Sequence, residues 1–332
     1  MQSTATTAHD VAAAQAFVTS RAPRLSMSEM TTYRWSFLED VSSYPSAGLS
    51  AVGIWRQKLE EFGEERGIEL LRESQLEVSS LSHAGGFTGS DGLSFREAMD
   101  DALDQVAIAG ALQAETLVVI SGARAGHTGN HARRLLRDAL TELGDAAAEC
   151  RLQIAVQPLH AQLGNRWSFL HSIEPTLEVL DRCDHPHVGM AFDVSQFWRE
   201  ADLCRKISLA APWIRLVQIS DCRGTTRSDG NDHCLPGRGM IPLVDILATL
   251  QQAGYPGYYE VQIQSDECWR ADYPTLIKEC HDALLPLWTL AQRSPMGSVS
   301  AGNHPAGGAN VASLQPTSSS GNTCVPGATP SV

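Results

Sequence analysis

Three titratable side chains follow short apolar runs of the sequence and have the chemistry of a proton-transfer site. Asp193 ends the run at 188–193, Asp221 directly follows the run at 214–220, and His160 comes three residues after the run at 152–157. A carboxylate and an imidazole that reach one substrate can act as general base and general acid. We therefore predict Asp193, His160 and Asp221 as catalytic residues, although Asp221 also has the position of a residue that caps the following loop.

A second group of side chains at the ends of the apolar runs has the chemistry to bind a polyhydroxyl ligand. Amides and carboxylates offer donors and acceptors to hydroxyl groups, and aromatic rings stack on sugar faces. Each residue taken alone could be a solvated or packed side chain, but polar residues at the end of almost every run favour a shared pocket. The predicted substrate-binding residues are Glu29, Trp55, His83, Gln157, Gln196, Gln218 and Gln262.

The elements that must position these residues are eight short strands, each followed by a helix. The β-rich runs lie at 24–30, 50–55, 76–82, 116–121, 152–157, 188–193, 214–220 and 258–263. Helical spacing of apolar residues follows at about 36–46, 57–73, 94–114, 129–149, 167–183, 199–210, 241–253 and 272–291. This count predicts an α/β fold, a single (β/α)8 TIM barrel, with its chemistry at the C-terminal ends of the strands. A doubly wound sheet is the alternative, but no glycine-rich fingerprint follows the first run.

From Arg24 to Trp288 the chain resembles the xylose isomerase-like TIM-barrel family, which contains sugar phosphate isomerases and epimerases. The matching stretches are "GGFTGSDG", "AVQPLH", "VGMAFDVSQFW", "RLVQISD", "DHCLPGRG" and "GYPGYYEVQI". In that family a Glu, an Asp, a His and a Glu at the ends of strands five to eight hold a divalent metal. The metal polarises a hydroxy-ketone while the two glutamates move protons between adjacent carbons. The resemblance therefore implies a barrel that isomerises or epimerises sugars.

The chain departs from the family at most of the metal-ligand positions. Gln157, Gln218 and Gln262 replace the Glu, His and Glu, and Asp193 alone is kept. Gln196 also stands where relatives often have His. Amide oxygens bind a hard cation weakly and bring no negative charge, and an amide neither gives nor takes a proton. We predict that these vestigial positions hold no metal tightly, binding Mg or Mn weakly at most, and that no cofactor is needed.

Two interpretations of the glutamines remain open. They are either the result of drift in an unused site, or a remade neutral pocket that still binds a polyol. Four independent changes to the same residue type favour the remade pocket. Glu260 lies two residues before Gln262, and we expect it deeper in the barrel, paired with a buried arginine and not replacing the lost ligand.

Two loops carry further candidates. In "LPGRG" at 235–239, Arg238 stands where relatives usually have an acidic residue. An arginine there could bind a phosphate or carboxylate of the substrate, or could simply be an exposed loop residue. The glycine-rich stretch at 83–92 follows the third strand, and we interpret it as a flexible loop.

Composition limits the classes of protein that the chain could represent. The 332 residues carry 38 acidic and 25 basic side chains, a formal net charge of −13, which argues against a nucleic-acid partner. The longest apolar runs are too short for a membrane span, and the first 20 residues lack the basic region of a secretory signal. The eight cysteines show no CxxC spacing, so we expect reduced thiols and a cytoplasmic protein.

The chain is predicted to divide into three segments. Residues 1–22 are rich in Ala and Thr and are expected to be flexible, and 23–293 form the barrel. Residues 294–332 contain no Asp, Glu, Lys or Arg and are rich in Gly, Ser and Pro. Such a composition buries too little apolar surface to offset the entropy of ordering, so we predict a disordered tail.

Three functions follow from these observations. The first is a sugar isomerase or epimerase that acts on a small polyol or keto-sugar with a degraded metal site. The second is a non-catalytic sugar-binding or regulatory relative. The third, an apurinic-site endonuclease of the same family, needs a large set of zinc ligands that the glutamines do not supply. A homo-oligomer is left open, since relatives are often dimers or tetramers.

Overall fold

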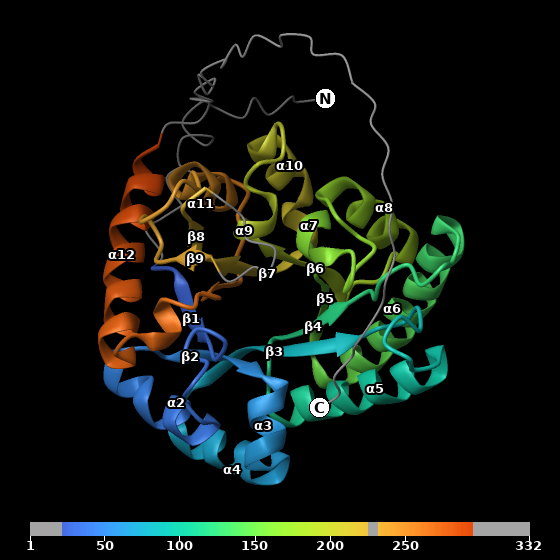
Figure 1. Cartoon of the computed structure of the whole chain (residues 1–332), viewed down its shortest axis with the longest axis horizontal. Coiled ribbons are helices and arrows are strands. Elements are labelled where there is room, and N and C mark those ends of the chain that lie inside the picture. The colour runs from blue at the N-terminus through green and yellow to red at the C-terminus, as the bar shows by residue number, and fades with distance from the viewer. Residues whose placement is uncertain (1–21, 225–231, 295–332) are drawn as a thin grey trace, which may run out of the picture. The chain divides into compact units, whose positions relative to one another are not determined.

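Eight parallel strands close into a barrel in the computed structural model, which describes residues 22–224 and 232–294. Around the barrel the order is β1-β10-β7-β6-β5-β4-β3-β2, and Figure 1 shows helices around this ring of strands. The predicted (β/α)8 barrel is confirmed, and the doubly wound sheet is not found. The strands are β1 (Arg24–Ser28), β2 (Ala51–Trp55), β3 (Glu77–Gly85), β4 (Thr116–Ile120), β5 (Gln153–Val156), β6 (Val188–Asp193), β7 (Ile214–Ile219) and β10 (Tyr258–Val261).

Helices form the outer layer and short elements decorate the loops. The longer helices are α2 (Phe37–Ser43), α3 (Arg56–Phe62), α4 (Glu64–Ser74), α5 (Phe95–Ala111), α6 (Gly129–Cys150), α8 (Ile173–Cys183), α10 (Leu203–Ala210), α11 (Leu243–Gln252) and α12 (Tyr273–Arg293). Two short helices, α7 (Ala161–Gly164) and α9 (Val194–Phe197), follow β5 and β6. A two-stranded ladder of β8 (Asp221–Cys222) and β9 (His233–Cys234) follows β7. Single 3-10 turns lie at Pro45–Ala47, Ala211–Trp213 and Cys268–Arg270.

Alternation along the strands creates two separate apolar cores. Side chains that point outward pack under the helices, whereas a small cluster fills the inside of the barrel. The inner cluster consists of Ala51, Val118, Ala155, Ala191, Leu216 and Tyr258. Residues two or four positions further along the same strands point inward as well, nearer the C-terminal mouth. This parity decides which side chains can reach a ligand at the mouth.

Capping residues fix where several of the helices begin. Ser36 and Ser94 start α2 and α5, and in each case a glutamate three residues later completes a capping box. Thr128 and Asp272 accept hydrogen bonds from the first turns of α6 and α12. These caps set the lengths of the loops that connect the strands to the helices at the mouth of the barrel.

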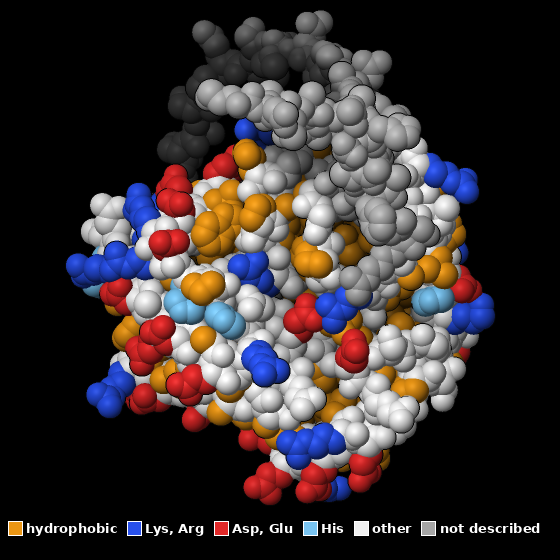
Figure 2. Space-filling model, turned by 180° about the vertical axis from the view of Figure 1, so that it is seen from behind, with side chains coloured by type: hydrophobic (Ala, Val, Ile, Leu, Met, Phe, Trp, Pro, Cys, Tyr) orange, Lys and Arg blue, Asp and Glu red, His pale blue; other side chains and the backbone are white. Residues whose placement is uncertain are grey.

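The predicted segments and surface properties can be compared with the structure only in part. Of the predicted flexible segments 1–22 and 294–332, all but Ala22 and Ser294 lie outside the described residues. Within the described ranges, no helix combines the length and apolarity needed to cross a bilayer. On the face that Figure 2 shows, acidic and basic side chains are interspersed and do not form a broad basic patch.

Candidate active site

Three glutamines meet at the C-terminal mouth of the barrel and form a hydrogen-bonded chain, here called the glutamine floor. Gln157 and Gln262 directly follow β5 and β10, and Gln218 lies within β7. Gln157 Nε2 donates to Gln218 Oε1 at 2.8 Å, and Gln218 Nε2 donates to Gln262 Oε1 at 2.9 Å. All three side chains are at most 8% exposed. Strand parity explains the meeting, because each glutamine lies an even number of residues after a member of the inner cluster.

A buried carboxylate sets the direction of this chain of amides. Glu260 is fully buried, and its Oε2 accepts hydrogen bonds from Ser79 Oγ at 2.8 Å and Ser80 Oγ at 2.7 Å. Its Oε1 faces the Nε2 of Gln218 at 3.4 Å. Burial raises the pKa of Glu260, while the hydrogen bonds from Ser80, Ser79 and Gln218 oppose that rise. The expected deep position is confirmed, but serines and an amide hold the carboxylate in place of the arginine that we predicted.

The glutamine floor therefore presents a defined pattern to the mouth. Because Gln218 turns its NH2 group toward Glu260 and Gln262, its oxygen must accept from Gln157. Gln157 Oε1 and Gln262 Nε2 then remain as one acceptor and one donor without a protein partner among the described residues. Ser28 Oγ adds a hydrogen bond to Gln262 Oε1 at 3.3 Å. A vicinal pair of hydroxyls, or a hydroxyl beside a carbonyl, matches an acceptor next to a donor.

Asp193 lies at the end of β6 and is only 4% exposed. Its Oδ1 accepts from Ser195 N at 2.9 Å and from Ser195 Oγ at 2.7 Å. Burial raises the pKa of Asp193, and the charge of His233 and the hydrogen bonds of Ser195 oppose that rise. A carboxyl whose pKa is raised is a stronger base in its ionised form, which suits proton abstraction.

His233 is a candidate that the sequence interpretation missed. It lies on β9, is 7% exposed, and its Nδ1 accepts from Gln264 N at 3.2 Å. That bond places the proton of the neutral ring on Nε2, which leaves a donor for another group. The signal was present in the stretch "DHCLPGRG", but only a structure shows that β8 packs beside α9, next to Asp193.

Gln196 connects the start of the loop after β5 to Ser195 and Asp193, and a hydrogen bond from its side chain helps to lower the pKa of Asp193 against the effect of burial. The backbone N–H of His160 donates to Gln196 Oε1 at 2.9 Å, and Gln196 Nε2 donates to Ser195 Oγ at 3.3 Å. The ring of His160 is exposed and caps α7, because its Nδ1 accepts from Gln162 N at 3.4 Å. Gln196 thus holds the start of the loop after β5. His160 caps α7 through Nδ1, and its role as a proton donor stays a prediction.

Asp221 has a structural role that replaces its predicted catalytic one. It is 1% exposed and accepts four backbone N–H groups, from Cys222, Gly237, Gly239 and Ile241, at 2.8–3.0 Å. Both oxygens are occupied, so neither is free to take a proton from a substrate. The alternative interpretation from the sequence, that Asp221 holds the loop that follows, agrees with these contacts.

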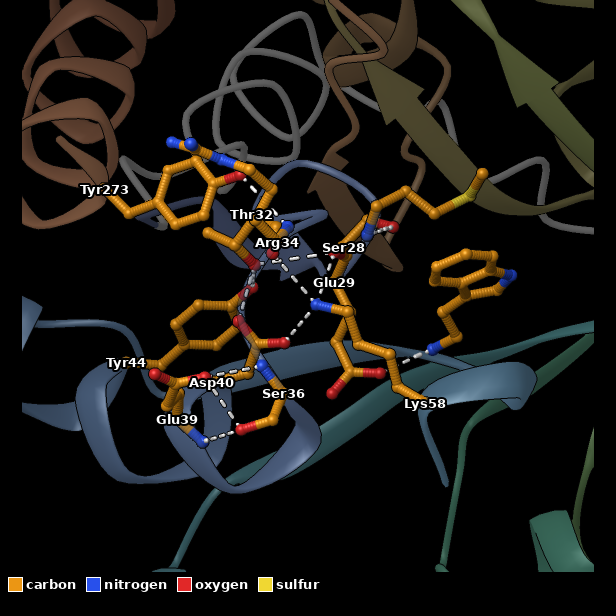
Figure 3. Close-up of polar contacts among 12 residues, drawn as sticks. Ser28, Glu29, Thr32, Arg34, Ser36, Glu39, Asp40, Tyr44, Lys58 and Tyr273 are labelled. Atoms are coloured by element: carbon orange, nitrogen blue, oxygen red, sulfur yellow. Dashed lines mark hydrogen bonds and ion pairs between the residues drawn. The ribbon is translucent and has the colours of Figure 1, made fainter. Parts of the chain in front are cut away.

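Glu29 points away from the mouth, which corrects its predicted role in substrate binding. Ser26 and Ser28 are the inward residues of β1, so Glu29 turns toward α2 and α3. Figure 3 shows it beside the buried group of Asp40, Lys58, Thr32 and Tyr44. Glu29 Oε2 accepts from Trp55 N at 2.7 Å, whereas Oε1 is buried without a hydrogen-bond partner. Burial first, and then the charge of Asp40, raises the pKa of Glu29 well above its ordinary value.

Aromatic rings form one wall of the mouth. The ring of Trp55 lies 5.5 Å from that of Tyr33, which stacks on Trp269 at 4.7 Å. Tyr33 is 47% exposed although it is flanked by two large rings, and Trp269 Nε1 donates to Met30 O at 2.9 Å. The structure thus places Trp55 in an aromatic cluster whose other members, Tyr33 and Trp269, we did not predict as site residues. Tyr33 follows β1 and Trp269 lies in the 3-10 turn after β10, and no local pattern in the sequence indicated that Tyr33 would lie between Trp55 and Trp269.

The last two predicted binding residues, His83 and Arg238, lie in different parts of the barrel mouth, one on β3 and the other after β9. His83 lies in β3 and lines a cavity. Loss of solvation by the surrounding protein lowers the pKa of His83, and the positive charge of Arg56 lowers it further. Its ring keeps exposed surface because the cavity is open to solvent. Arg238 is exposed in a turn that lies against α12, in a hollow also lined by Glu279 and Asp282. Acidic neighbours make that turn a poor anion site, so the structure favours the exposed-loop interpretation of Arg238.

The donor set at the vestigial positions does not fit the metal of the family. One carboxylate and three neutral amides replace the charged set, and the amides already bond to one another. Within residues 22–224 and 232–294, no group of three or more His, Cys, Asp or Glu side chains is arranged to hold a metal ion.

Comparison with known proteins agrees with the barrel fold. A family model for the xylose isomerase-like TIM barrel matches residues 45–285. The chain belongs to this family. Among solved structures, a protein of Sinorhizobium meliloti 1021 is 26% identical, with a TM-score of 0.74 over 80% of this chain and 98% of the other. No curated protein matches the chain.

Two other solved structures share the fold at lower sequence identity. A zinc-bound IolI protein is 19% identical, with a TM-score of 0.71 over 80% of this chain and 98% of its own. The 3-keto-D-glucoside 4-epimerase of E. coli is 16% identical, with a TM-score of 0.65 over 81% of this chain and 100% of its own. At these identities the likeness concerns the fold.

Proposed function

We propose that the chain is a sugar isomerase or epimerase that binds a small polyol or keto-sugar on the glutamine floor without a tightly held metal. The observation that carries the proposal is the hydrogen-bonded chain of Gln157, Gln218 and Gln262 at the strand ends where this family holds its metal. Two hydrogen bonds, from Gln218 to Glu260 and from Ser28 to Gln262, fix the direction of this chain, and two serines hold Glu260 in turn, which is more order than an unused site requires. The aromatic wall of Tyr33, Trp55 and Trp269 supplies a surface for a sugar face.

Proton transfer in this proposal uses the titratable pair at the mouth. Asp193 removes the proton from the carbon next to the substrate's carbonyl, and His233 Nε2–H donates to the carbonyl oxygen to give an enediol. For isomerisation, Asp193 returns its proton to the former carbonyl carbon, and the other enediol hydroxyl gives its proton back to His233 as the new carbonyl forms. For epimerisation, a water molecule at the open mouth protonates the other face of the original carbon, the resulting hydroxide takes the proton from Asp193, and the enediol hydroxyl restores the proton of His233. Gln262 Nε2 donates to the same oxygen region and holds the substrate in place.

The first test separates this proposal from the family's usual chemistry. Elemental analysis of the purified protein for Mn, Zn, Co and Mg should find less than stoichiometric metal after dialysis. One tightly held metal ion per chain would contradict a metal-free site. Chelator treatment should leave sugar binding, followed by calorimetry, unchanged.

The second test asks whether the chain is catalytic. We expect turnover of a ketose or aldose in a screen by chromatography, and we expect Asp193→Asn to reduce kcat at least about 100-fold, as for loss of a general base. Asp245→Asn, a change of an acidic residue in the outer helix α11, serves as the matched control.

A non-catalytic sugar-binding protein is the second candidate function. It is favoured by the same glutamines, because none of them titrates and they satisfy one another. The triple change Gln157→Glu, Gln218→His and Gln262→Glu restores the ligand set of the family. If metal binding and turnover appear only in that variant while the natural chain binds sugar, the chain is a binding relative.

A further inference from the structure

A cavity of about 590 Å³ lies beside the glutamine floor and is not part of it. It opens between the loop that follows His83 and the segment that follows α7, and Ile120 and Gly122 at the end of β4 form its base. Its volume is that of a small-molecule site. Its polar and aromatic lining includes Arg56, His83, Asp91, Asp101, Arg166 and Trp167.

The wall formed by the glycine-rich loop is held in place by the neighbouring strand. Gly86 N donates to Ile120 O at 3.0 Å, Ala123 N donates to Ser90 Oγ at 3.0 Å, and His127 Nε2 lies 3.1 Å from Thr88 O. A Cβ at residue 85 would come within 1.9 Å of Ile120 O, so only glycine permits this approach. The segment that we interpreted as a flexible loop is therefore a preformed wall.

The opposite wall exposes a large aromatic ring. Trp167 is 53% exposed, yet its backbone N–H donates to Gly164 O at 2.8 Å. The next residue, Ser168, forms a bridge with Gly122 and shares a hydrogen bond with Ser121 Oγ at 3.0 Å. The ring is thus held over the cavity by the hydrogen bonds of Trp167 N and Ser168. An exposed tryptophan that is held in place at the edge of a polar cavity suits stacking on the face of a sugar ring.

The charged groups of the cavity differ in how much binding capacity they keep. Arg56 is occupied by Asp101, through two hydrogen bonds of 2.8 and 2.6 Å, and by Glu60. Arg166 lies 5.3 Å from the ring of Trp167 and has no ion pair with any described acidic residue. Its five N–H donors, the imidazole of His83 and Asp91 Oδ2 remain for hydroxyl groups, whereas Asp91 Oδ1 accepts from Leu93 N at 3.2 Å. With two arginines and two aspartates, the lining has no excess of either charge.

The position of the cavity relative to the floor suggests one connected ligand. His83 lies on β3 and Gln157 follows β5, with β4 between them, so the two sites are about 10 Å apart at ordinary strand spacing. Gln157 N also donates to Val119 O at 2.8 Å, which ties the floor to the strand under the cavity. A single sugar ring does not span that distance, whereas two linked rings do.

We propose that the cavity at Trp167 and Arg166 is a second carbohydrate subsite, which binds the glycosyl substituent of a substrate whose reacting ring lies on the glutamine floor. This inference rests on the proposed function and narrows its substrate class to glycosides. Trp167 stacks on the second ring, and Arg166, His83 and Asp91 bind its hydroxyl groups.

The test compares each monosaccharide with its own glycoside. Isothermal titration calorimetry is run on the full chain with D-glucose against trehalose and maltose, and with D-fructose against sucrose. We expect at least one glycoside to bind about tenfold or more tightly than its monosaccharide. Trp167→Ala should remove that difference without affecting the monosaccharide, and Trp167→Phe should keep most of it. Leu290→Ala, which removes an exposed apolar side chain of α12, is the matched control.

Each outcome has a defined meaning. If monosaccharides bind, and Gln262→Leu weakens them, but no glycoside binds more tightly, the subsite is wrong and the glutamine floor stands. If glycosides bind through Trp167 but are insensitive to Gln262→Leu, the subsite stands and the proposed function of the floor fails. If Trp167→Ala leaves the preference for glycosides intact, the subsite is wrong. Absence of binding by every sugar in the set overturns both.

Discussion

Glutamine and glutamate fill nearly the same volume, but only glutamate can change its charge or take a proton. The glutamine floor therefore offers the same donor and acceptor across the pH range in which a carboxylate site would titrate. The charge that remains near it belongs to Asp193 at the mouth and Glu260 below it. Compared with the charged ligand set of the family, these three side chains carry no charge and instead form a fixed pattern of hydrogen bonds.

Glu29 should make the stability of the protein depend on pH. Its pKa is raised by burial, so the native state keeps a proton that the unfolded state loses above about pH 4.3. The contribution of Glu29 to the free energy of unfolding is fully present below that pH, and it is lost as the pH rises toward the raised native pKa. Glu29→Gln should therefore be more favourable relative to wild type at pH 8 than at pH 5. Urea unfolding at both values measures this, and an equal effect at the two pH values would contradict the buried, raised carboxyl.

Asp221 should matter for stability more than for chemistry. Asp221→Asn leaves one acceptor oxygen for four backbone N–H groups and turns an NH2 group toward some of them. We expect a loss of about 2–4 kcal/mol in the free energy of unfolding. Denaturant titration measures it, with the helical Asp245→Asn as control. A variant that keeps its stability but loses turnover would restore Asp221 as a catalytic residue.

At the scale of the elements, the barrel interior depends on one small residue. Gly53 in β2 lies against the carboxylate of Glu260, and a Cβ there would meet Glu260 Oε2 at 2.2 Å. The serines of β3 and the amide of β7 hold that carboxylate from the other sides. Below the glutamine floor, Gly53 of β2 and Glu260 of β10 thus fill the barrel interior together, with β1 between their strands.

Gly53→Ala should therefore lower the free energy of unfolding, and the size of this loss should depend on Glu260. We expect a loss of at least about 2 kcal/mol from overpacking, with weaker sugar binding because the direction of the amide chain is disturbed. In Gly53→Ala combined with Glu260→Ala, the loss should be smaller than the sum of the two single changes. Thermal and urea unfolding of the four proteins give the coupling energy, and strict additivity would contradict the contact.

The sequence predicted the elements better than the directions of their side chains. Eight alternating runs and helices were enough for the barrel, and even spacing from the inner cluster also brings the three glutamines together. The same spacing, applied to "LSMSE" with Ser26 and Ser28 inward, would have turned Glu29 outward. The contacts of Tyr33, Trp269, Trp167 and His233 depend on loops that meet across the mouth, and no local pattern encodes those meetings.

At the scale of the whole molecule, the net charge of −13 belongs to the barrel segment, since 1–22 and 294–332 together hold one acidic and one basic residue. We propose from composition that 294–332 contributes nothing to the stability of the barrel. A chain that ends at Ser294 should melt within about 2 °C of the full chain. A chain that ends at Asp272 loses α12 and its buried Leu276, Ile277 and Leu284, and it should not fold. Scanning calorimetry of the three proteins makes the comparison.

The closure of the barrel between β1 and β10 has a consequence for incomplete chains. Arg24 to Met27 pair with Tyr258 to Val261, near opposite ends of the described chain. A chain that stops before Tyr258 leaves the backbone groups of β1 and β7 without partners, and unpaired strand edges add readily to other chains. Premature termination upstream of residue 258 is therefore expected to give aggregates and not a smaller barrel.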